Sequence, residues 1–224
     1  MHSWNLTVNE AIKLQTRLSA FIDCTGKPEI IGLVAGVDIA YDLQKNKAFC
    51  AIALFHYPQP ELVNVHYDTM AIQFPYIPGL LSFREGPLIL KTYKNIRTKP
   101  DLLILDGHGM AHPRNFGIAA HIGLLLDIPS IGCAKSILSG TYTQPGKEKY
   151  AKNYLFDRNR EKKGVVLRTR TATKPVFVSP GYRIGIDESA EVIMNCITRY
   201  RIPEPVRIAN IKVSEFKRSK TGQG

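Results

Sequence analysis

The first apolar pattern along the chain predicts an amphipathic helix over residues 8–23, which we expect to pack on a core. Apolar residues recur there at helical spacing, at Ala11, Leu14, Leu18 and Phe21. Thr7 and Glu10 fit a capping box at the start of this helix. Gly26 and Pro28 end the pattern, because neither residue continues a helix well.

Three segments rich in β-branched, aromatic and other apolar residues follow, and we expect strands over 33–41, 47–57 and 61–72. Their connections, residues 44–46 and 58–60, are short and contain turn residues. Because a parallel crossover needs roughly a dozen residues, two short connections in succession predict an antiparallel meander.

After residue 76 the pattern changes to alternating helices and strands. We expect helices over 86–97, 116–127 and 187–200, buried strands over 101–106 and 128–133, and a hairpin over 165–170 and 175–179. The order strand, helix, strand in the middle of this region indicates a parallel crossover unit.

Together these elements predict an α/β fold in which helices flank both faces of a mixed sheet. No repeat or low-complexity linker divides the sequence, so we expect a single domain over residues 1–224. The polar and basic residues from about 215 to 224 predict a mobile tail.

The charge balance adds a partner to this picture. The chain has 30 Lys and Arg against 19 Asp and Glu, a formal net charge of +11, which favours a polyanion such as nucleic acid. We expect no membrane partner, because the longest apolar stretch, 117–134, is interrupted by His121, Asp127 and Pro129. Wide spacing favours free thiols in a reducing cytoplasm over disulfides for the four cysteines, Cys24, Cys50, Cys133 and Cys196.

Three acidic residues stand at positions where a metal site could form. Asp38 lies inside an apolar run, Asp106 ends another, and Glu85 opens a predicted helix. A carboxylate in a buried strand needs a cation or hydrogen-bond donors to replace its hydration. Three converging carboxylates would form an all-oxygen site suited to Mg²⁺, which supports phosphodiester cleavage. Each acid taken alone is as well explained by a residue that faces water or pairs with an arginine.

The glycine-rich segment 107–113 allows other interpretations. It follows a strand, as a dinucleotide-binding loop does, but His112 stands where the third glycine of such a loop belongs. His108 and His112 are four residues apart, as zinc ligands on a helix can be, but Pro113 opposes a regular helix. A glycine-rich turn with a structural histidine is the plainest interpretation.

Residues 74–83 form an apolar segment in which Pro75 and Pro78 frame Tyr76. Such a rigid loop can act as a wedge between bases, with the tyrosine stacked where a base was extruded. From these residues alone, an ordinary loop packed on the core is the simpler interpretation.

Taken together, the segments resemble the endonuclease V family. The motifs occur in the family's order over nearly the whole chain, from Asn9 to Ala209. They comprise residues 36–41 (GVDIAY), 75–85 (PYIPGLLSFRE), 105–109 (LDGHG), 112–114 (HPR), 131–136 (IGCAKS) and 201–207 (RIPEPVR). The block 75–85 is highly specific by itself.

The resemblance implies a ribonuclease H-like fold and an endonuclease directed to inosine. It implies a site for Mg²⁺, with Mn²⁺ as a substitute, formed by Asp38, Glu85 and Asp106, and a catalytic Lys135 beside the scissile phosphate. Cleavage at the second phosphodiester bond 3′ to the inosine would leave 3′-hydroxyl and 5′-phosphate ends and would initiate repair of deaminated adenine. The implied partner is inosine-containing DNA or RNA, bound by a monomer in the cytoplasm.

The resemblance also implies a pocket for an extruded hypoxanthine, with Arg114 near its mouth. Hypoxanthine lacks the exocyclic amine of adenine and guanine, so a tight pocket can reject the normal purines. The substrate-binding residues implied are Tyr76, Pro78, Gly79, Leu81, Gly107, His112, Ile118 and Leu138.

One position departs from the family pattern. Where the family often has a His or Asp that contributes to the metal site, this chain has Asn210. Its carbonyl can contact a metal weakly or through water but has no charge, so we expect a lower metal affinity. Two other hypotheses remain: an inosine reader that cuts poorly, suggested by Asn210, and a zinc hydrolase that uses His108 and His112.

Overall fold

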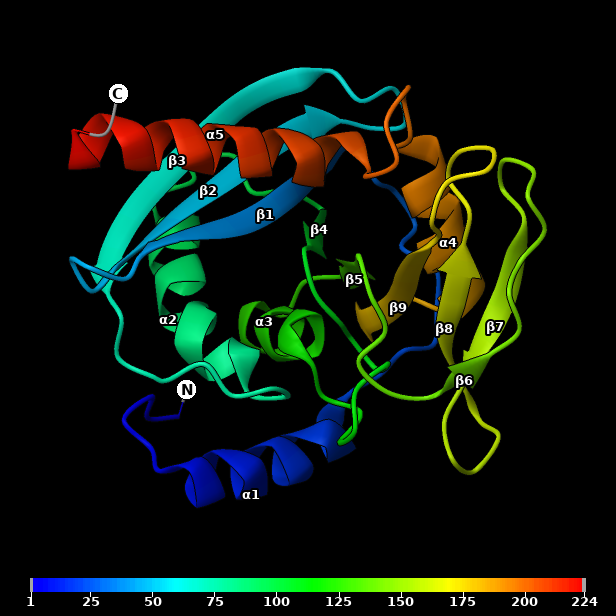
Figure 1. Ribbon diagram of the computed structural model, residues 1–224, viewed down its shortest axis with the longest axis horizontal. Coiled ribbons are helices and arrows are strands. Elements are labelled where there is room, and N and C mark those ends of the chain that lie inside the picture. Colours follow the sequence, from blue (N-terminus) through cyan, green and yellow to red (C-terminus); the bar gives the residue numbers. More distant parts are fainter. Residues whose placement is uncertain (1, 223–224) are drawn as a thin grey trace.

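The computed structural model describes residues 2–222, which form one large sheet with helices around it (Figure 1). The helices are α1 (Val8–Leu18), η1 (Ser19–Phe21, 3-10), α2 (Leu81–Lys94), α3 (Ile118–Leu126), α4 (Ile186–Asn195) and α5 (Glu204–Thr221). The strands are β1 (Leu33–Asp42), β2 (Lys47–His56), β3 (Leu62–Ala71), β4 (Leu102–Leu105), β5 (Ser130–Ala134), β6 (Thr141–Tyr142), β7 (Lys152–Phe156), β8 (Lys162–Leu167) and β9 (Val176–Tyr182). The strand order is β3-β2-β1-β4-β5-β9-β8-β7-β6.

The predicted meander and crossover unit are confirmed. β1, β2 and β3 pair antiparallel in sequence, as their short connections require. β4 joins β1 in parallel, and β5 joins β4 in parallel through α3. All three parallel strands therefore end at one edge of the sheet, where loops gather.

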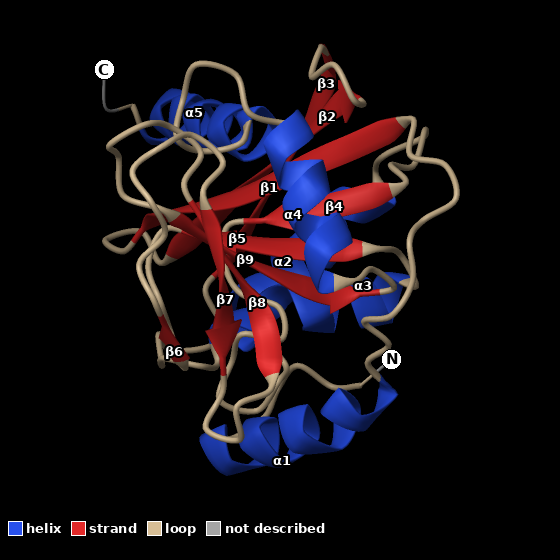
Figure 2. Cartoon of the chain, turned by 90° about the vertical axis from the view of Figure 1, so that its right-hand side faces the viewer, coloured by secondary structure: helices blue, strands red, loops and turns tan. Residues whose placement is uncertain are grey.

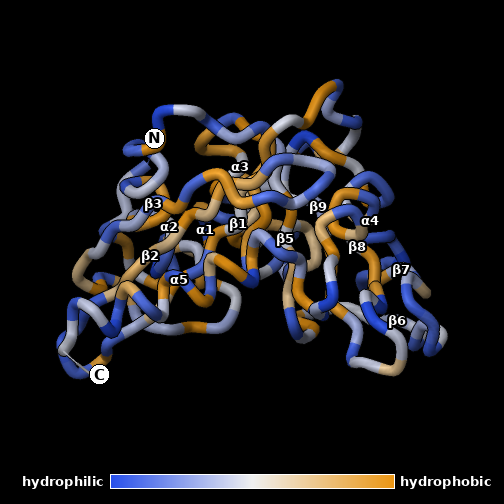
Figure 3. Tube along the Cα trace, turned by 90° about the horizontal axis from the view of Figure 1, so that it is seen from above, coloured by the Kyte–Doolittle hydropathy of each residue, from blue (hydrophilic) through white to orange (hydrophobic). Residues whose placement is uncertain are grey.

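The second half of the sheet is antiparallel. The predicted late hairpin is confirmed as β8 and β9, and β9 joins the centre of the sheet by pairing with β5. The sequence did not predict β6 or β7, which are short and carry several exposed or half-exposed polar side chains. Figure 3 shows the β6–β7 end of the molecule as predominantly hydrophilic, whereas apolar segments follow the central strands and helices.

Helices cover both faces of the sheet and form three layers (Figures 1 and 2). One apolar core joins a sheet face to α4 and α5, through residues such as Val192 and Val206. The other core joins the opposite face to α2 and α3, through residues such as Leu88 and Ile122. The capping box at Thr7 confirms the predicted start of α1, which packs on a smaller cluster beyond α2.

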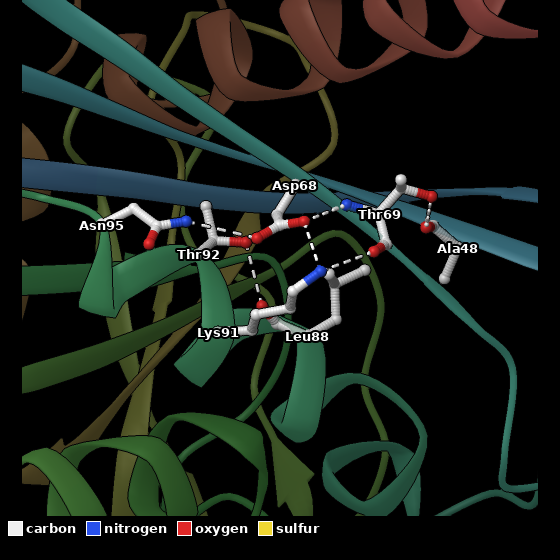
Figure 4. Close-up of polar contacts among 7 residues, drawn as sticks. All are labelled: Ala48, Asp68, Thr69, Leu88, Lys91, Thr92 and Asn95. Atoms are coloured by element: carbon white, nitrogen blue, oxygen red, sulfur yellow. Dashed lines mark hydrogen bonds and ion pairs between the residues drawn. The ribbon is translucent and has the colours of Figure 1, made fainter.

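Polar contacts fasten α2 to the edge strand β3 (Figure 4). Lys91 Nζ donates to Asp68 Oδ1 at 2.7 Å and to the Thr69 carbonyl at 3.1 Å. Asn95 Nδ2 donates to the other oxygen of Asp68 at 3.3 Å. Because α2 carries one of the candidate metal ligands, these contacts also fix the backbone of the site.

Two predicted helix boundaries were wrong. α2 begins at Leu81 rather than residue 86, because the helix tolerates Pro87 within its second turn. α4 ends at Asn195 rather than residue 200, where the Cys196 N–H bonds back to the carbonyls of the last turn. The basic tail from about residue 215 is helical as far as Thr221 in α5, a helix that the sequence did not predict, and its mobility stays a prediction. Residues 223 and 224 lie outside the described residues.

No helix within residues 2–222 is long and apolar enough to cross a membrane. All four cysteines are free thiols, and three of them are buried; Cys24 is half-buried.

Candidate active site

Two neighbouring parallel strands bring Asp38 and Asp106 side by side. Val37 on β1 lies opposite Leu105 on β4, and the Asp106 N–H donates to the Val37 carbonyl at 3.4 Å. The next residue on each strand is one of the two acids. Glu85 joins them from the second turn of α2. All three predicted carboxylates are half-buried at this edge of the sheet.

A close helix crossing brings Asn210 to the same group. A Cβ atom on Gly36 of β1 would lie 2.1 Å from the backbone of Pro205 in α5, so only glycine permits this approach. The next turn of α5 then carries Asn210 to the carboxylate two residues beyond Gly36. Asn210 Nδ2 donates to Asp38 Oδ2 at 2.6 Å.

Each carboxylate has a polar contact with a neighbouring side chain. Tyr41 Oη donates to Glu85 Oε1 at 2.7 Å, Asn210 serves Asp38, and Lys135 Nζ forms an ion pair with Asp106 Oδ2. Burial lowers the pKa of Lys135, but its hydrogen bond and charge contact with Asp106 outweigh burial and raise it. Lys135 is therefore a cation at neutral pH.

Asp38 and Glu85 each have a pKa above the ordinary value of a carboxyl group. Burial raises the pKa of Asp38 to about 6, and the charge of Asp106 adds to the rise. Burial raises the pKa of Glu85 to about 8, and the charges of both aspartates add to the rise. A divalent cation would favour the ionised forms, and three carboxylates with an amide carbonyl are the oxygen donors that Mg²⁺ prefers.

These oxygen ligands are of the right chemical type for such a cation, but they are not arranged around a common metal position. Among residues 2–222, no three His, Cys, Asp or Glu side chains lie close enough to hold a metal ion as they stand. The carboxylates instead keep their contacts with Tyr41, Asn210 and Lys135. Binding a cation would exchange these contacts for metal–oxygen contacts.

Beside the carboxylates lies a cavity of about 310 Å³. All eight residues predicted to bind substrate line it, together with Asp106 and Lys135. The sequence missed further lining residues: Gln15, Ile77, Ser82, His108, Gly117, Ala134, Ser136 and Ile137. Most of these are sequence neighbours of predicted residues, whereas Gln15 comes from α1 and gave no signal in the sequence.

A tight turn forms one wall of the cavity. The Leu80 N–H donates to the Ile77 carbonyl at 2.9 Å, with Pro78 second and Gly79 third in the turn. Gly79 has φ +80°, which identifies a type II turn and explains the glycine. The side chain of Tyr76, just before the turn, is 69% exposed at the cavity rim, so it is free to contact a ligand.

Three side chains converge on the carbonyl of Gly79. Gln15 Nε2 lies 3.0 Å, His112 Nε2 2.9 Å and Arg114 Nη2 2.8 Å from this oxygen. Gln15 also donates to the Phe116 carbonyl at 3.0 Å and accepts from Arg114 Nε at 2.7 Å. These contacts hold the turn rigidly, as a selective pocket requires.

His112 has a structural part in this network. Its Nδ1 accepts from the Arg114 N–H at 3.1 Å, so its Nε2 carries the proton donated to Gly79. Burial lowers the pKa of His112 to about 4, which keeps the ring neutral. Both ring nitrogens of His112 therefore form hydrogen bonds within the protein. His112 has no free nitrogen for the metal contact that the zinc hypothesis for His108 and His112 requires.

A group of acids and a lysine beside a cavity, on an α/β fold, is an arrangement that nucleic-acid-cleaving enzymes use, and the comparisons with known proteins place the chain in that class. The endonuclease V family model matches residues 14–211. The chain therefore belongs to the endonuclease V family, whose members are metal-dependent nucleases.

Individual relatives match over nearly their full length. Endonuclease V of Gloeobacter violaceus is 47% identical, over 94% of this chain and 86% of the relative. The crystal structure of endonuclease V from Streptomyces avermitilis superposes with a TM-score of 0.92 at 33% identity, covering 98% of this chain and 96% of the other. A Ciona intestinalis endonuclease V, solved in complex with a 24mer DNA containing an inosine followed by a ribo-adenosine, has a TM-score of 0.82 at 21% identity, covering 95% and 98%.

Proposed function

We propose that this protein is a Mg²⁺-dependent endonuclease that nicks nucleic acid at the second phosphodiester bond 3′ to an inosine or deoxyinosine. The observation that carries the proposal is the shared cavity. The rigid Gly79 turn and the exposed Tyr76 line the same space as Asp106 and Lys135. A base held in the cavity would therefore place its own strand beside the acids and the lysine.

The cavity suits one extruded base. Its volume, about 310 Å³, is at the lower end of the ~300–1,000 Å³ typical of ligand sites. The backbone at Gly79 and Gly107 and the apolar side chains of Leu81, Ile118 and Leu138 form part of its lining, and an exocyclic amine held against these apolar groups would be left without a partner. Tyr76 would stack in the gap left by the base.

Phosphate chemistry would be carried out by the acids beside the cavity and by Lys135 in its lining. Asp38, Glu85 and Asp106 would hold Mg²⁺, with Asn210 contributing its carbonyl weakly or through water. The bound ion would supply Lewis-acid stabilisation of the phosphate and an activated water. Lys135 would bind the scissile phosphate and stabilise the charge that develops on it. Mn²⁺, which also prefers oxygen ligands, would substitute.

The inosine-containing DNA bound to the Ciona intestinalis relative supports nucleic acid with inosine as the substrate class. We propose deoxyinosine in DNA, the product of adenine deamination, as the natural lesion. We also propose a monomeric enzyme; light scattering after size-exclusion chromatography would show a dimer if this is wrong.

The test is a nicking assay on end-labelled strands with one deoxyinosine or one inosine, with and without Mg²⁺. We expect metal-dependent nicks at the second bond 3′ to the lesion and uncut normal strands. Cutting without a divalent ion, or equally at unmodified adenine, would contradict the proposal.

A second candidate function is an inosine reader that binds and cuts poorly. Asn210 favours it, because the amide occupies Asp38 Oδ2 and brings no charge to a metal. Tight inosine binding without nicking, even at high Mg²⁺ or Mn²⁺, would establish the reader.

A further inference from the structure

Beyond Lys135 the molecule has a second concave site, which we call the basic pocket. It has a volume of about 360 Å³ and is lined by Lys149, Arg170, Thr171, Thr198 and Arg199. All five side chains are exposed. They come from three loops, before β7, after β8 and after α4, so the fold rather than the local sequence gathers these cations.

Hydrogen bonds hold the three loops together. The Tyr150 N–H donates to the Arg168 carbonyl at 2.6 Å, which joins the first two loops. Thr169 Oγ1 donates to the Arg201 carbonyl at 2.6 Å, which joins the second and third loops. Tyr150 Oη also reaches the Met194 carbonyl at 3.4 Å. The cations therefore stand on a braced scaffold.

The charge of the basic pocket is only partly balanced, by the charge of Glu204 acting on Arg199. Within residues 2–222, none of its three cations forms an ion pair, and no acidic side chain lines it. The nearby Glu204 is paired with Arg207 at 2.5 Å and also accepts from Thr198 Oγ1 at 2.9 Å. Three unpaired cations in one concavity favour a polyanionic backbone.

The basic pocket is joined to the candidate active site through Arg201. This residue follows Arg199 by two positions, and its Nη2 donates to the Lys135 carbonyl at 2.9 Å. It also donates to the Lys174 and Pro175 carbonyls, both at 2.7 Å. Base cavity, Lys135, Arg201 and basic pocket thus follow one another along the same edge of the sheet.

We propose that the basic pocket binds backbone phosphates of the substrate on the 3′ side of the cut bond. This rests on the proposed function, because the base cavity and Lys135 define the 5′-to-3′ direction. The pocket would anchor the strand beyond the site of chemistry. It would add affinity independent of base sequence, since phosphate contacts read no bases.

The test compares duplexes with one deoxyinosine in binding assays without divalent metal, so that the strand stays intact. One duplex ends just 3′ of the cut bond, a second extends 3′ by about one helical turn, ~10 base pairs, and a third extends 5′ by the same length. We expect the wild-type protein to gain roughly tenfold in affinity from the 3′ extension. The slope of log K against log salt concentration should become steeper by about 2–3, because each phosphate contact contributes about 0.9 to it.

The triple variant Lys149→Gln, Arg170→Gln, Arg199→Gln should lose this gain and this slope while keeping its melting temperature, because all three side chains are exposed. A matched triple variant, Lys94→Gln, Arg97→Gln, Arg158→Gln, removes the same charge from exposed positions near the opposite ends of the strands and should keep both.

A gain retained by the first variant, lost equally in the control, or produced by the 5′ extension would overturn the proposal. Inorganic phosphate at millimolar concentration should compete weakly with the 3′-extended duplex; competition as strong as that of an added oligonucleotide would instead assign the pocket to free phosphate. Failure of the wild-type protein to nick these duplexes in a separate assay with Mg²⁺ would count against the proposed function alone, because the difference in affinity and salt slope between the wild-type protein and the triple variant would still report whether the three cations bind phosphates.

Discussion

At the scale of single residues, the site is a set of half-buried carboxylates, each in polar contact with a neighbouring side chain. Tyr41 donates a hydrogen bond to Glu85, and Asn210 donates one to Asp38. Lys135 forms an ion pair with Asp106. This arrangement stabilises buried acids in the absence of metal, and it makes metal binding a competition against protons and internal contacts.

The competition predicts a pH dependence. Burial raises the folded-state pKa of Glu85 from 4.5 to about 8, so the metal-free protein loses stability as the pH rises between these values. Mg²⁺ should restore this stability, because it binds the ionised carboxylate. At pH 6, two pH units below the pKa of Glu85, competition from the proton should weaken Mg²⁺ binding by up to ~100-fold. Thermal melts should therefore show a larger Mg²⁺-induced stabilisation at pH 8.5 than at pH 6. An equal shift at both pH values, or a pH step unchanged in Glu85→Gln, would contradict the assignment.

Asn210 gives a second prediction at this scale. Asn210→Asp adds a charged oxygen next to Asp38, so half-maximal nicking should need about tenfold less Mg²⁺, within the ~10–100-fold range of metal-site substitutions. Asn210→Ala, which removes the amide without adding charge, is the control and should not improve metal use. An Asp variant that needs as much Mg²⁺ as the parent would show that Asn210 does not limit metal affinity.

At the scale of elements, α1 is part of the base cavity although its sequence reads as an ordinary surface helix. Its buried Gln15 is 1% exposed and bonds to the Gly79 turn, the Phe116 carbonyl and Arg114. The helix therefore braces the turn from outside.

Gln15→Leu tests this role. It leaves Arg114 Nε and the Phe116 carbonyl without their partner, which should lower the free energy of unfolding by about 1–3 kcal/mol. A looser turn should raise KM for the inosine substrate more than it lowers kcat. Lys13→Ala on the exposed face of the same helix should change neither, and a Gln15 variant with unaltered KM would exclude α1 from base recognition.

At the scale of the whole molecule, the proposed function assigns base reading to the cavity and bond cutting to the acids beside it. Tyr76 and the Gly79 turn come from the connection between β3 and α2, whereas Asp38 and Asp106 end or interrupt parallel strands. Loss of one function should therefore spare the other.

Asp106→Ala should abolish nicking and leave inosine binding intact by fluorescence anisotropy. Tyr76→Ala should weaken inosine binding by about tenfold, in line with ~1–3 kcal/mol for stacking on one base. Phe21→Ala, also exposed (64%) but outside the cavity, is the matched control and should bind normally. Equal loss of binding in the Asp106 variant would show that the two tasks are not separable.

The sequence by itself determined the order of elements and the chemistry available to them. The turn residues between the first three strands allowed only an antiparallel meander, the apolar runs around Asp38 and Asp106 marked central strands, and the motifs identified the family. These features are local, because hydrophobic periodicity and turn chemistry act between near neighbours in the chain.

Only the tertiary structure decided which distant groups meet. Val206, Ala209, Val213 and Phe216 stand at helical spacing and could have predicted α5, but its place on the sheet depends on the close approach between Gly36 and Pro205. That crossing brings Asn210 to Asp38, as the packing of α1 brings Gln15 to Gly79 and as three braced loops bring Lys149, Arg170 and Arg199 together. Such contacts depend on the packing of whole elements, which no spacing along the sequence records.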